Sequence, residues 1–224
     1  TYRDESKAAF LPRFFKTGKG EYGEGDQFIG VVVPNLRIVA KKHFDADFDT
    51  LRELLASPYH EYRLTALLAL TYRYAKLKDH ASRETCVNFY VSQVDAINNW
   101  DLVDLSCYKI LGHWLFDKDK QLLYDWAKEN HLWKQRIAMI SCMHFVKQGE
   151  FKDALAIADL LQHHPHDLIH KAVGWILREI GKENEQLLVD YLTPRYKKMP
   201  RTMLRYAIER FEEGKRKAFL NSMI

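Results

Sequence analysis

Apolar residues recur every three or four positions through almost the whole chain, which is the period of an α-helix with one buried face. No segment shows the strict alternation that is typical of a half-buried strand. The helical segments come as pairs, a shorter one and then a longer one. They are expected at about 47–56 and 59–77, 83–96 and 100–117, 119–129 and 132–148, 151–163 and 167–181, and 184–195 and 200–212.

The longer helices share a sequence core in which a basic residue precedes an apolar run. The cores begin at Arg63, Arg136, Lys171 and Arg205, and the last three begin 35 and 34 residues apart. This spacing favours an all-α fold of HEAT-like helical hairpins stacked into a curved solenoid, with residues 1–224 as a single domain. Small residues within these cores are expected to let neighbouring helices approach closely; they are Ala66, Ala138, Gly174 and Ala207.

A cation repeated at one register would form a positive track along the concave face of such a solenoid, which suits a backbone of phosphates. Residues 131–224 carry 16 Lys and Arg against 11 Asp and Glu, and residues 195–217 carry nine basic side chains against three acidic ones. These counts favour a polyanionic partner, either nucleic acid or an acidic membrane surface. The alternatives are a solvated helix face and cations that pair with acids on the adjacent helix.

Composition is that of an ordinary globular protein, with 47% apolar and 29% charged residues. No apolar run approaches the roughly 20 residues that cross a bilayer, and the visible start carries no secretory leader. Cys86, Cys107 and Cys142 form no close pair and lie among apolar neighbours, so we expect buried, reduced thiols in a cytoplasmic protein.

The only glycine-rich passage, residues 17–26, is expected to be an ordered loop between an N-terminal helix and a helix running from about Gln27 to Lys42. It lacks the Gly-Lys-Ser/Thr ending of a phosphate-binding loop, so nucleotide binding is not expected there.

Asp104 breaks the repeat, because it stands 32 residues before Arg136, at the register where the other long helices carry a cation. An acidic residue is unfavourable for binding phosphates, so its presence in this row of cations indicates a catalytic role at that position. Trp100, four residues earlier, shares its helical face. The alternatives are that Asp104 serves the helix dipole and that Trp100 belongs to the core. Asn98 or Asn99 already supplies the cap, however, and Asp101 an acid in the first turn. A lesser alternative pairs Asp101 with Asp104 as acid and base.

Several motifs together resemble the AlkD-like DNA alkylation repair family, a family of HEAT-like repeat DNA glycosylases that remove N3- and N7-alkylated purines. Their order and spacing cover nearly the whole chain. They are Phe14 to Gly18, Gly20 to Asp26, Phe28 to Val31, Pro34, Leu36-Arg37, Ala40-Lys41, Asn99 to Asp104, Trp133 to Arg136 and Lys171 to Glu179.

The resemblance implies a catalytic set of Asp104, Trp100, Arg136 and Trp175. An alkylated purine is cationic and leaves as a neutral base, so the enzyme needs a carboxylate beside the developing sugar cation and a positioned water. Asp104 would supply that carboxylate, the indoles would face the cation, and Arg136 would clamp a phosphate. A core role remains the alternative for Trp175. Further DNA contacts are expected from Arg37, Arg63, Lys134, Lys171, Arg178, Arg205 and Tyr22.

The expected partner is double-stranded DNA with alkylated purines, bound by a monomer without cofactor or metal, in the cytoplasm and at the nucleoid when DNA is bound. His163, His164, His166 and His170 invite a metal interpretation, but we expect a helix-start loop with exposed imidazoles instead. The second function hypothesis is a non-catalytic HEAT-like module that binds DNA or protein.

Overall fold

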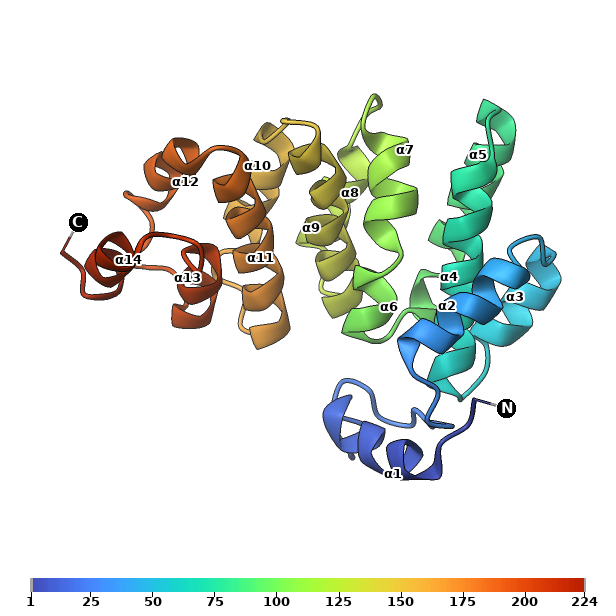
Figure 1. The fold of residues 1–224 in the computed structure, drawn as a ribbon. Helices are drawn as coiled ribbons and strands as arrows, with labels where there is room; N and C mark the ends of the chain where they lie inside the picture. The colour runs from blue at the N-terminus through green and yellow to red at the C-terminus, as the bar shows by residue number, and fades with distance from the viewer. Residues whose placement is uncertain (1, 224) are drawn as a thin grey trace. The chain divides into compact units, whose positions relative to one another are not determined.

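The structure, a computed structural model, describes residues 2–223, and the regular elements of this range are helices (Figure 1). The only bridge between extended residues in the range pairs Gln27 with Tyr59. The chain divides into two compact units, Thr1–Trp114 and Leu115–Ile224. The all-α fold class is therefore confirmed, whereas the assignment of the chain to a single domain stays a prediction. None of the described helices is long and apolar enough to cross a membrane.

The first unit is built around one long, central helix, α4, against which α2, α3, α5 and α6 pack. Its elements are α1 (Glu5–Phe14), α2 (Val33–Lys42), α3 (Phe48–Leu55), α4 (His60–Lys76), α5 (His80–Ser92), the 3-10 turn η1 (Val94–Ala96), α6 (Trp100–Asp104), the π-helical η2 (Tyr108–Gly112) and α7 (His113–Leu115), whose last residue opens the second unit. Aspartates cap α3 and α5: Asp47 accepts from the Thr50 amide and Asp79 from the Ser82 amide. The centre of α4 is buried on nearly every side, from Leu64 to Thr71.

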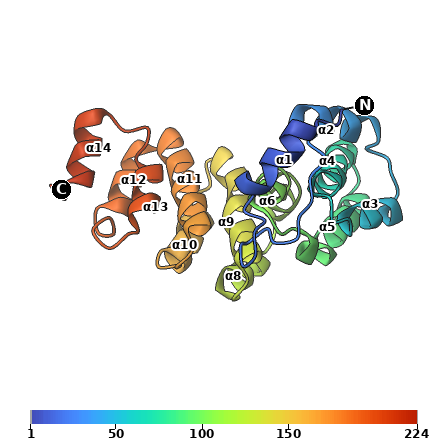
Figure 2. The ribbon, with the colours of Figure 1, turned by 90° about the horizontal axis from the view of Figure 1, so that it is seen from below.

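The second unit is a succession of helical hairpins, and the second helices of these hairpins, α9, α11 and α13, pack in succession (Figure 2). The elements are α8 (Gln121–Lys128), α9 (Leu132–Lys147), α10 (Lys152–Leu161), α11 (Asp167–Glu183), α12 (Glu185–Leu192), α13 (Arg201–Ala207) and α14 (Glu213–Leu220). The expected pairs recur here within a few residues, apart from a shorter last pair, and α14 is an additional helix.

Gly174 shows why the repeat carries small residues. A Cβ at this position of α11 would lie 2.5 Å from Tyr206 Cβ and 2.6 Å from the Met203 carbonyl oxygen, both on α13. The two helices therefore approach too closely for any side chain, as expected from the sequence. Ala138 and Ala207 are likewise buried in this unit.

The helix expected from about Gln27 begins only at Val33, and this correction has a clear cause. Residues 27–32 form an extended segment, apart from Gly30, because their backbone groups bond to other segments. The Gln27 amide donates to the Pro58 carbonyl oxygen at 2.9 Å, and the Gln27 carbonyl oxygen accepts from the His60 amide at 2.9 Å. Gly30 has a φ of 81°, and a Cβ there would lie 1.9 Å from the Asp4 carbonyl oxygen.

The continuous helix expected over 100–117 is also a wrong prediction, because it is broken after Asp104. Helix α6 has only five residues, a turn at Leu105 and Ser106 follows, and η2 then continues the chain. Ser106 Oγ donates to the Leu102 carbonyl oxygen at 2.5 Å. Such a side-chain bond back to the preceding turn competes with regular helix bonds.

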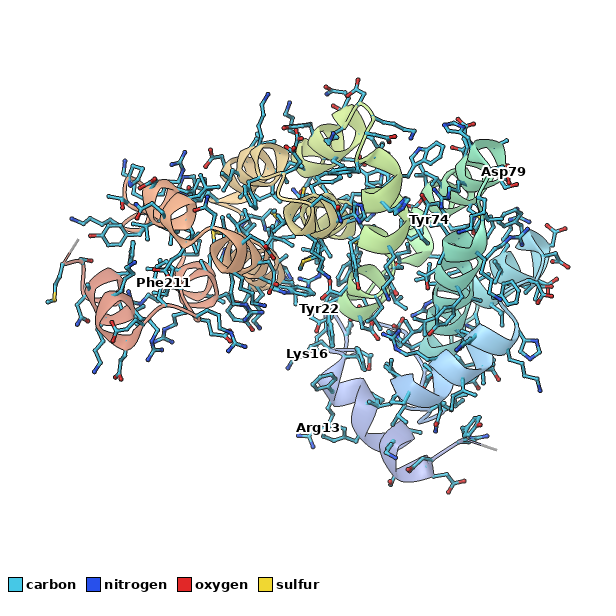
Figure 3. All side chains as sticks on the ribbon, turned by 45° about the horizontal axis from the view of Figure 1, so that its top comes forward. Arg13, Lys16, Tyr22, Tyr74, Asp79 and Phe211 are labelled. Carbon is cyan, nitrogen blue, oxygen red and sulfur yellow. The ribbon has the colours of Figure 1, made fainter. Side chains whose placement is uncertain are left out.

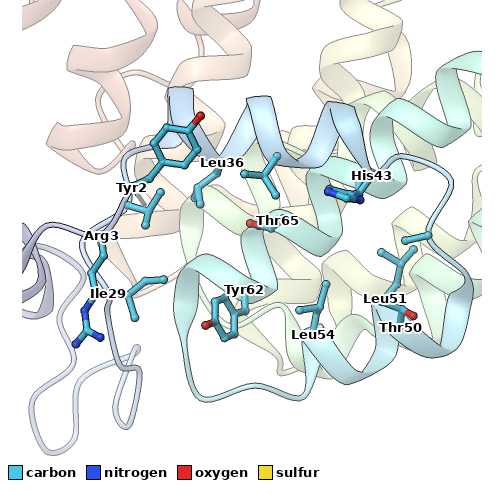
Figure 4. Close-up of a pocket in the computed structure, with 14 residues that line it drawn as sticks. Tyr2, Arg3, Ile29, Leu36, His43, Thr50, Leu51, Leu54, Tyr62 and Thr65 are labelled. Atoms are coloured by element: carbon cyan, nitrogen blue, oxygen red, sulfur yellow. The ribbon is translucent and has the colours of Figure 1, made fainter.

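The three cysteines, Cys86, Cys107 and Cys142, are buried, as expected. The first unit also contains an apolar cavity of about 530 Å³ between α2, α3, α4 and the segment near Tyr2 (Figure 4). Leu36, Leu51 and Leu54 are among its lining side chains.

Candidate functional site

Helix α6 presents the two residues that the sequence singled out, Trp100 and Asp104, at its two ends. Asn99 caps the helix, since its Oδ1 accepts from the Trp100 amide at 2.9 Å. Trp100 and Asp104 are both half-buried, whereas Asp101, Leu102 and Val103 between them are buried. The helix therefore turns its middle inward and leaves parts of Trp100 and Asp104 accessible.

An aromatic stack supports the Trp100 indole from one side. The Phe15 ring lies nearly parallel to it, with centroids 5.4 Å apart and an angle of 13° between the planes. Phe28 continues the stack 5.2 Å beyond Phe15. Phe14, which is 51% exposed, meets the indole edge-on at 5.9 Å. The indole is thus held in place by its neighbours and is still partly accessible.

Behind α6 lies a buried histidine, His60, between two carboxylates. Its Nδ1 is 3.1 Å from Asp26 Oδ2, and its Nε2 is 2.8 Å from Asp101 Oδ2. Burial disfavours the charged ring, but the hydrogen bonds to Asp101 and Asp26 outweigh it and raise the pKa of His60 to about 9. At neutral pH both ring nitrogens are therefore protonated and both donate.

Asp26 is the second junction of this network. Its Oδ2 lies 2.5 Å from Arg63 Nη2, and its Oδ1 accepts from Asn98 Nδ2 at 3.0 Å. Burial alone would raise the pKa of Asp26. The hydrogen bonds from His60 and Asn98 and the charge of Arg63 prevail and lower it. Arg63 also donates to the Ser57 carbonyl oxygen at 2.9 Å, and its side chain is only 7% exposed. This cation of the repeat register lies inside the protein.

Glu61, the neighbour of His60, fastens the extended segment before α2. Its carboxylate accepts hydrogen bonds from the amides of Ile29, Gly30 and Val31 at 2.8–3.2 Å, and Glu61 itself is buried. Because an extended segment outside a sheet has no ladder to satisfy its amides, the carboxylate takes that place. His60, Glu61 and Arg63 thus tie the loop, the extended segment and α6 to one end of α4.

The remaining predicted residues of the first unit, Arg37 and Tyr22, are half-buried. Arg37 lies on α2. Tyr22 lies in the glycine-rich loop, close to Lys16, which follows the end of α1 (Figure 3). The structure thus brings Trp100 and Asp104 together on α6 and places Arg63 among buried partners.

In the second unit, Arg136 and Trp175 lie on α9 and α11. Arg136 is 4% exposed and donates through Nη1 to the Leu168 carbonyl oxygen at 2.5 Å, whereas Trp175 is half-buried. The remaining predicted cations differ in their surroundings. Lys134 pairs with Glu129, Lys171 with Asp167, and Arg178 with Glu179 and Glu209, whereas Arg205 is exposed and has no ion pair within the described part of the chain.

The histidine-rich segment forms the start of α11. The His164 Nδ1 accepts from the His166 amide at 3.0 Å, and the His166 Nδ1 accepts from the Leu168 amide at 3.1 Å. Burial, together with positive neighbours, lowers the pKa of both rings, so they are neutral bases in these bonds. Within residues 2–223, no group of three potential ligands is arranged to hold a metal ion. The segment is a helix-start loop in which His163 is exposed, as expected, whereas His164, His166 and His170 are half-buried.

Most of the chain matches a known protein family. Residues 1–211 match the family described as DNA alkylation repair enzyme. The chain belongs to this family. Among solved structures, a predicted DNA alkylation repair enzyme from Enterococcus faecalis superposes with a TM-score of 0.71 at 14% identity, over 94% of this chain and 97% of that one.

A second solved structure, AlkD2 from Streptococcus mutans, superposes with a TM-score of 0.58 at 15% identity, over 93% of this chain and 99% of that one. At these identities the similarity shows a shared fold. A search of curated proteins finds no match.

In this member of the DNA alkylation repair family, the sequence interpretation missed the network around His60. Its partners Asp26 and Asp101 stand 34 and 41 residues away, so no local pattern connects them. The available signal was the start of α4, where three polar side chains, His60, Glu61 and Arg63, directly precede the apolar run that begins at Leu64.

Proposed function

We propose that this protein is a DNA glycosylase that hydrolyses the N-glycosidic bond of N3- and N7-alkylated purines in duplex DNA. The carrying observation is the arrangement of α6. Asp104 is partly accessible, Trp100 beside it is supported by Phe15, and the other carboxylate of the helix, Asp101, is engaged by His60. Membership in the family adds the DNA and the alkyl damage as context.

The chemistry requires little from the protein. The bond between the sugar C1′ and the purine nitrogen breaks, and its electron pair goes to the base, which thereby becomes neutral. Asp104 stabilises the positive charge that develops on the sugar. It also accepts a hydrogen bond from the water whose oxygen then bonds to C1′, and the proton lost from that water passes to Asp104 or to solvent. Neutral damaged bases such as uracil lack the initial charge and are not expected to be released.

The other residues are assigned to DNA contacts. The partly exposed face of Trp100 is proposed to contact the cationic nucleotide, with a contribution of about 0.5–2 kcal/mol. Tyr22 and Arg37 are retained as contacts of the first unit. We assign Arg63 to the internal frame instead, because its guanidinium is shared between Asp26, Asn98 and Ser57.

In the second unit, Trp175 is proposed to contact the DNA together with Arg136. Arg136 is buried and donates to the Leu168 carbonyl oxygen, so its contact with a phosphate would require the side chain to turn toward the surface. Arg205 is available as it stands. The ion-paired cations, which are Lys134, Lys171 and Arg178, would exchange carboxylates for phosphates. We further propose that the protein acts as a monomer in the cytoplasm, at the nucleoid.

The test is release of free 3-methyladenine and 7-methylguanine from methylated duplex DNA. We expect release by the unaltered protein and a rate at least about 100-fold lower for Asp104→Asn. Asp45→Asn, which removes an exposed carboxylate from the same unit, is the matched control and should retain full activity. Undiminished release by Asp104→Asn would refute the site, although the activity would stand.

The alternative function is a non-catalytic module, and the basic excess of the second unit favours DNA as its ligand. Binding of methylated duplex by the unaltered protein without any release of base would support this alternative and exclude the glycosylase.

A further inference from the structure

We propose that His60 is a positioning residue for this reaction: through its hydrogen bond to Asp101 it fixes the orientation of α6, and with it Trp100 and Asp104. The inference rests on the proposed function and adds to it the element that aligns the carboxylate.

Helix α6 needs an attachment to the rest of the unit because it is too short to be stable alone. A helix of five residues has hardly any internal i to i−4 bonds and is not stable alone. Asn99 caps its first residue, and Asp101 Oδ2 attaches it to His60 at 2.8 Å. Asp101 stands between Trp100 and Asp104 in the sequence, so a rotation of α6 about this point would displace both.

His60 itself is held from several directions. It is the first residue of the 17-residue helix α4. Its second nitrogen bonds to Asp26, which is also bound by Arg63 from the next turn of α4. Phe15 and Phe28 face its ring with centroids 4.7 and 5.0 Å away. The ring therefore cannot turn, and Asp101 is tied to a rigid support. Displacements below 1 Å at a reacting group are enough to slow a reaction strongly.

The charge on His60 is part of this arrangement. The charged groups that face its ring are Asp26 from the loop and Asp101 from α6. On its own helix, Arg63 binds the same Asp26, and Glu61 binds the amides of the extended segment. Both ring nitrogens point at carboxylates, so loss of one proton would set a lone pair against a carboxylate oxygen. Since the pKa of His60 is raised to about 9, both bonds are retained at neutral pH, and one of the two is lost in alkali, which weakens the attachment of α6 through His60.

The experiment compares His60→Gln with Asp101→Asn and with the double variant. Single-turnover release of 7-methylguanine is measured with protein in excess, alongside the Kd for the same DNA and thermal unfolding. We expect the release rate to fall by about 10-fold or more in each single variant, with the Kd within about twofold of the unaltered protein. The double variant should lose little more than either single one, because both changes cut the same link. His43→Gln, at an exposed histidine of the same unit, should change nothing.

The pH profile adds a second measurement, and it is restricted to pH values at which thermal unfolding shows that the protein is still folded. The rate of the unaltered protein should fall as the pH passes about 9, and this decline should be absent in His60→Gln. A folded His60→Gln that releases base at the normal rate would overturn the inference and leave the glycosylase standing. If His60→Gln does not fold, normal release by Asp101→Asn would overturn it equally. An unaltered protein that releases no base would overturn the glycosylase, and the positioning role with it.

Discussion

The two units bury different kinds of side chain. Within the described residues, the first unit buries the charged groups Asp26, His60, Glu61, Arg63 and Asp101, whereas Arg136 is the buried charged residue of the second. The second unit instead buries small and branched apolar side chains along α9, α11 and α13, and its carboxylate pairs lie at the surface, as for Arg195 with Asp159.

The difference follows from the regularity of the elements. In the hairpins of the second unit, most backbone N–H and C=O groups form hydrogen bonds within their own helix, so apolar packing is enough to hold the helices together. The first unit also contains a glycine-rich loop, an extended segment and the short α6, whose backbone groups cannot all form hydrogen bonds within the same element. Buried carboxylates and their cationic partners take over that task, and the proposed reactive residues are carried by one of these irregular elements. The following predictions address this contrast.

The largest loss of free energy of unfolding is expected for Asp26→Ala. The change would leave the positive charges of His60 and Arg63 buried without their shared partner, at a cost of about 3–5 kcal/mol. In the second unit, Lys217→Ala removes the exposed partner of Glu213 and should cost about 0–1 kcal/mol. Hydrogen exchange in α4 and in α11 would report the free energy of opening of each unit separately. Similar losses in both variants would refute the contrast.

A second effect is the dependence of stability on pH. The pKa of His60 is raised from 6.5 to about 9, so its contribution is complete below pH 6.5 and is lost as the pH rises through about 9. The contribution amounts to about 3 kcal/mol for a shift of this size. The pKa values of His164 and His166 are lowered, so their smaller contribution is present above 6.5 and is lost as the pH falls through the lowered values.

Denaturant unfolding from about pH 5 to about pH 10 measures both effects. His60→Gln should abolish the alkaline loss and retain the acid one, and His164→Gln should reduce the acid loss and retain the alkaline one. An alkaline loss that persists in His60→Gln would contradict the assignment of that loss to His60.

The smallest effect concerns the packing of the second unit. Gly174→Ala should destabilise it by about 1–3 kcal/mol, because the new methyl group meets the backbone of Met203. Gly181→Ala is the matched control. Its methyl group meets only the flexible end of Leu188, and the better helix propensity of alanine, about 1 kcal/mol, offsets that contact. Urea midpoints of the two variants would separate them, and equal midpoints would contradict the close contact of α11 with α13.

The sequence predicted the helices wherever their period was local. Helices α9 and α11 lie within a few residues of their expected ranges, and the cap of α6 is Asn99, one of the two expected residues. The late start of α2 was beyond such reasoning, because the residues before it are held by Glu61, about 30 positions away. For the same reason the repeat placed Arg63 in register with Arg136, yet Asp26 could not be recognised as its partner.

The close contact of Gly30 with Asp4 can be used to compare this sequence with related ones. With a positive φ and the Asp4 carbonyl oxygen where a Cβ would stand, position 30 admits no other residue along the present path of the chain. A related sequence that carries a side chain at the aligned position must therefore route its first residues differently. Such a substitution marks a divergent member of the family from its amino-acid sequence alone.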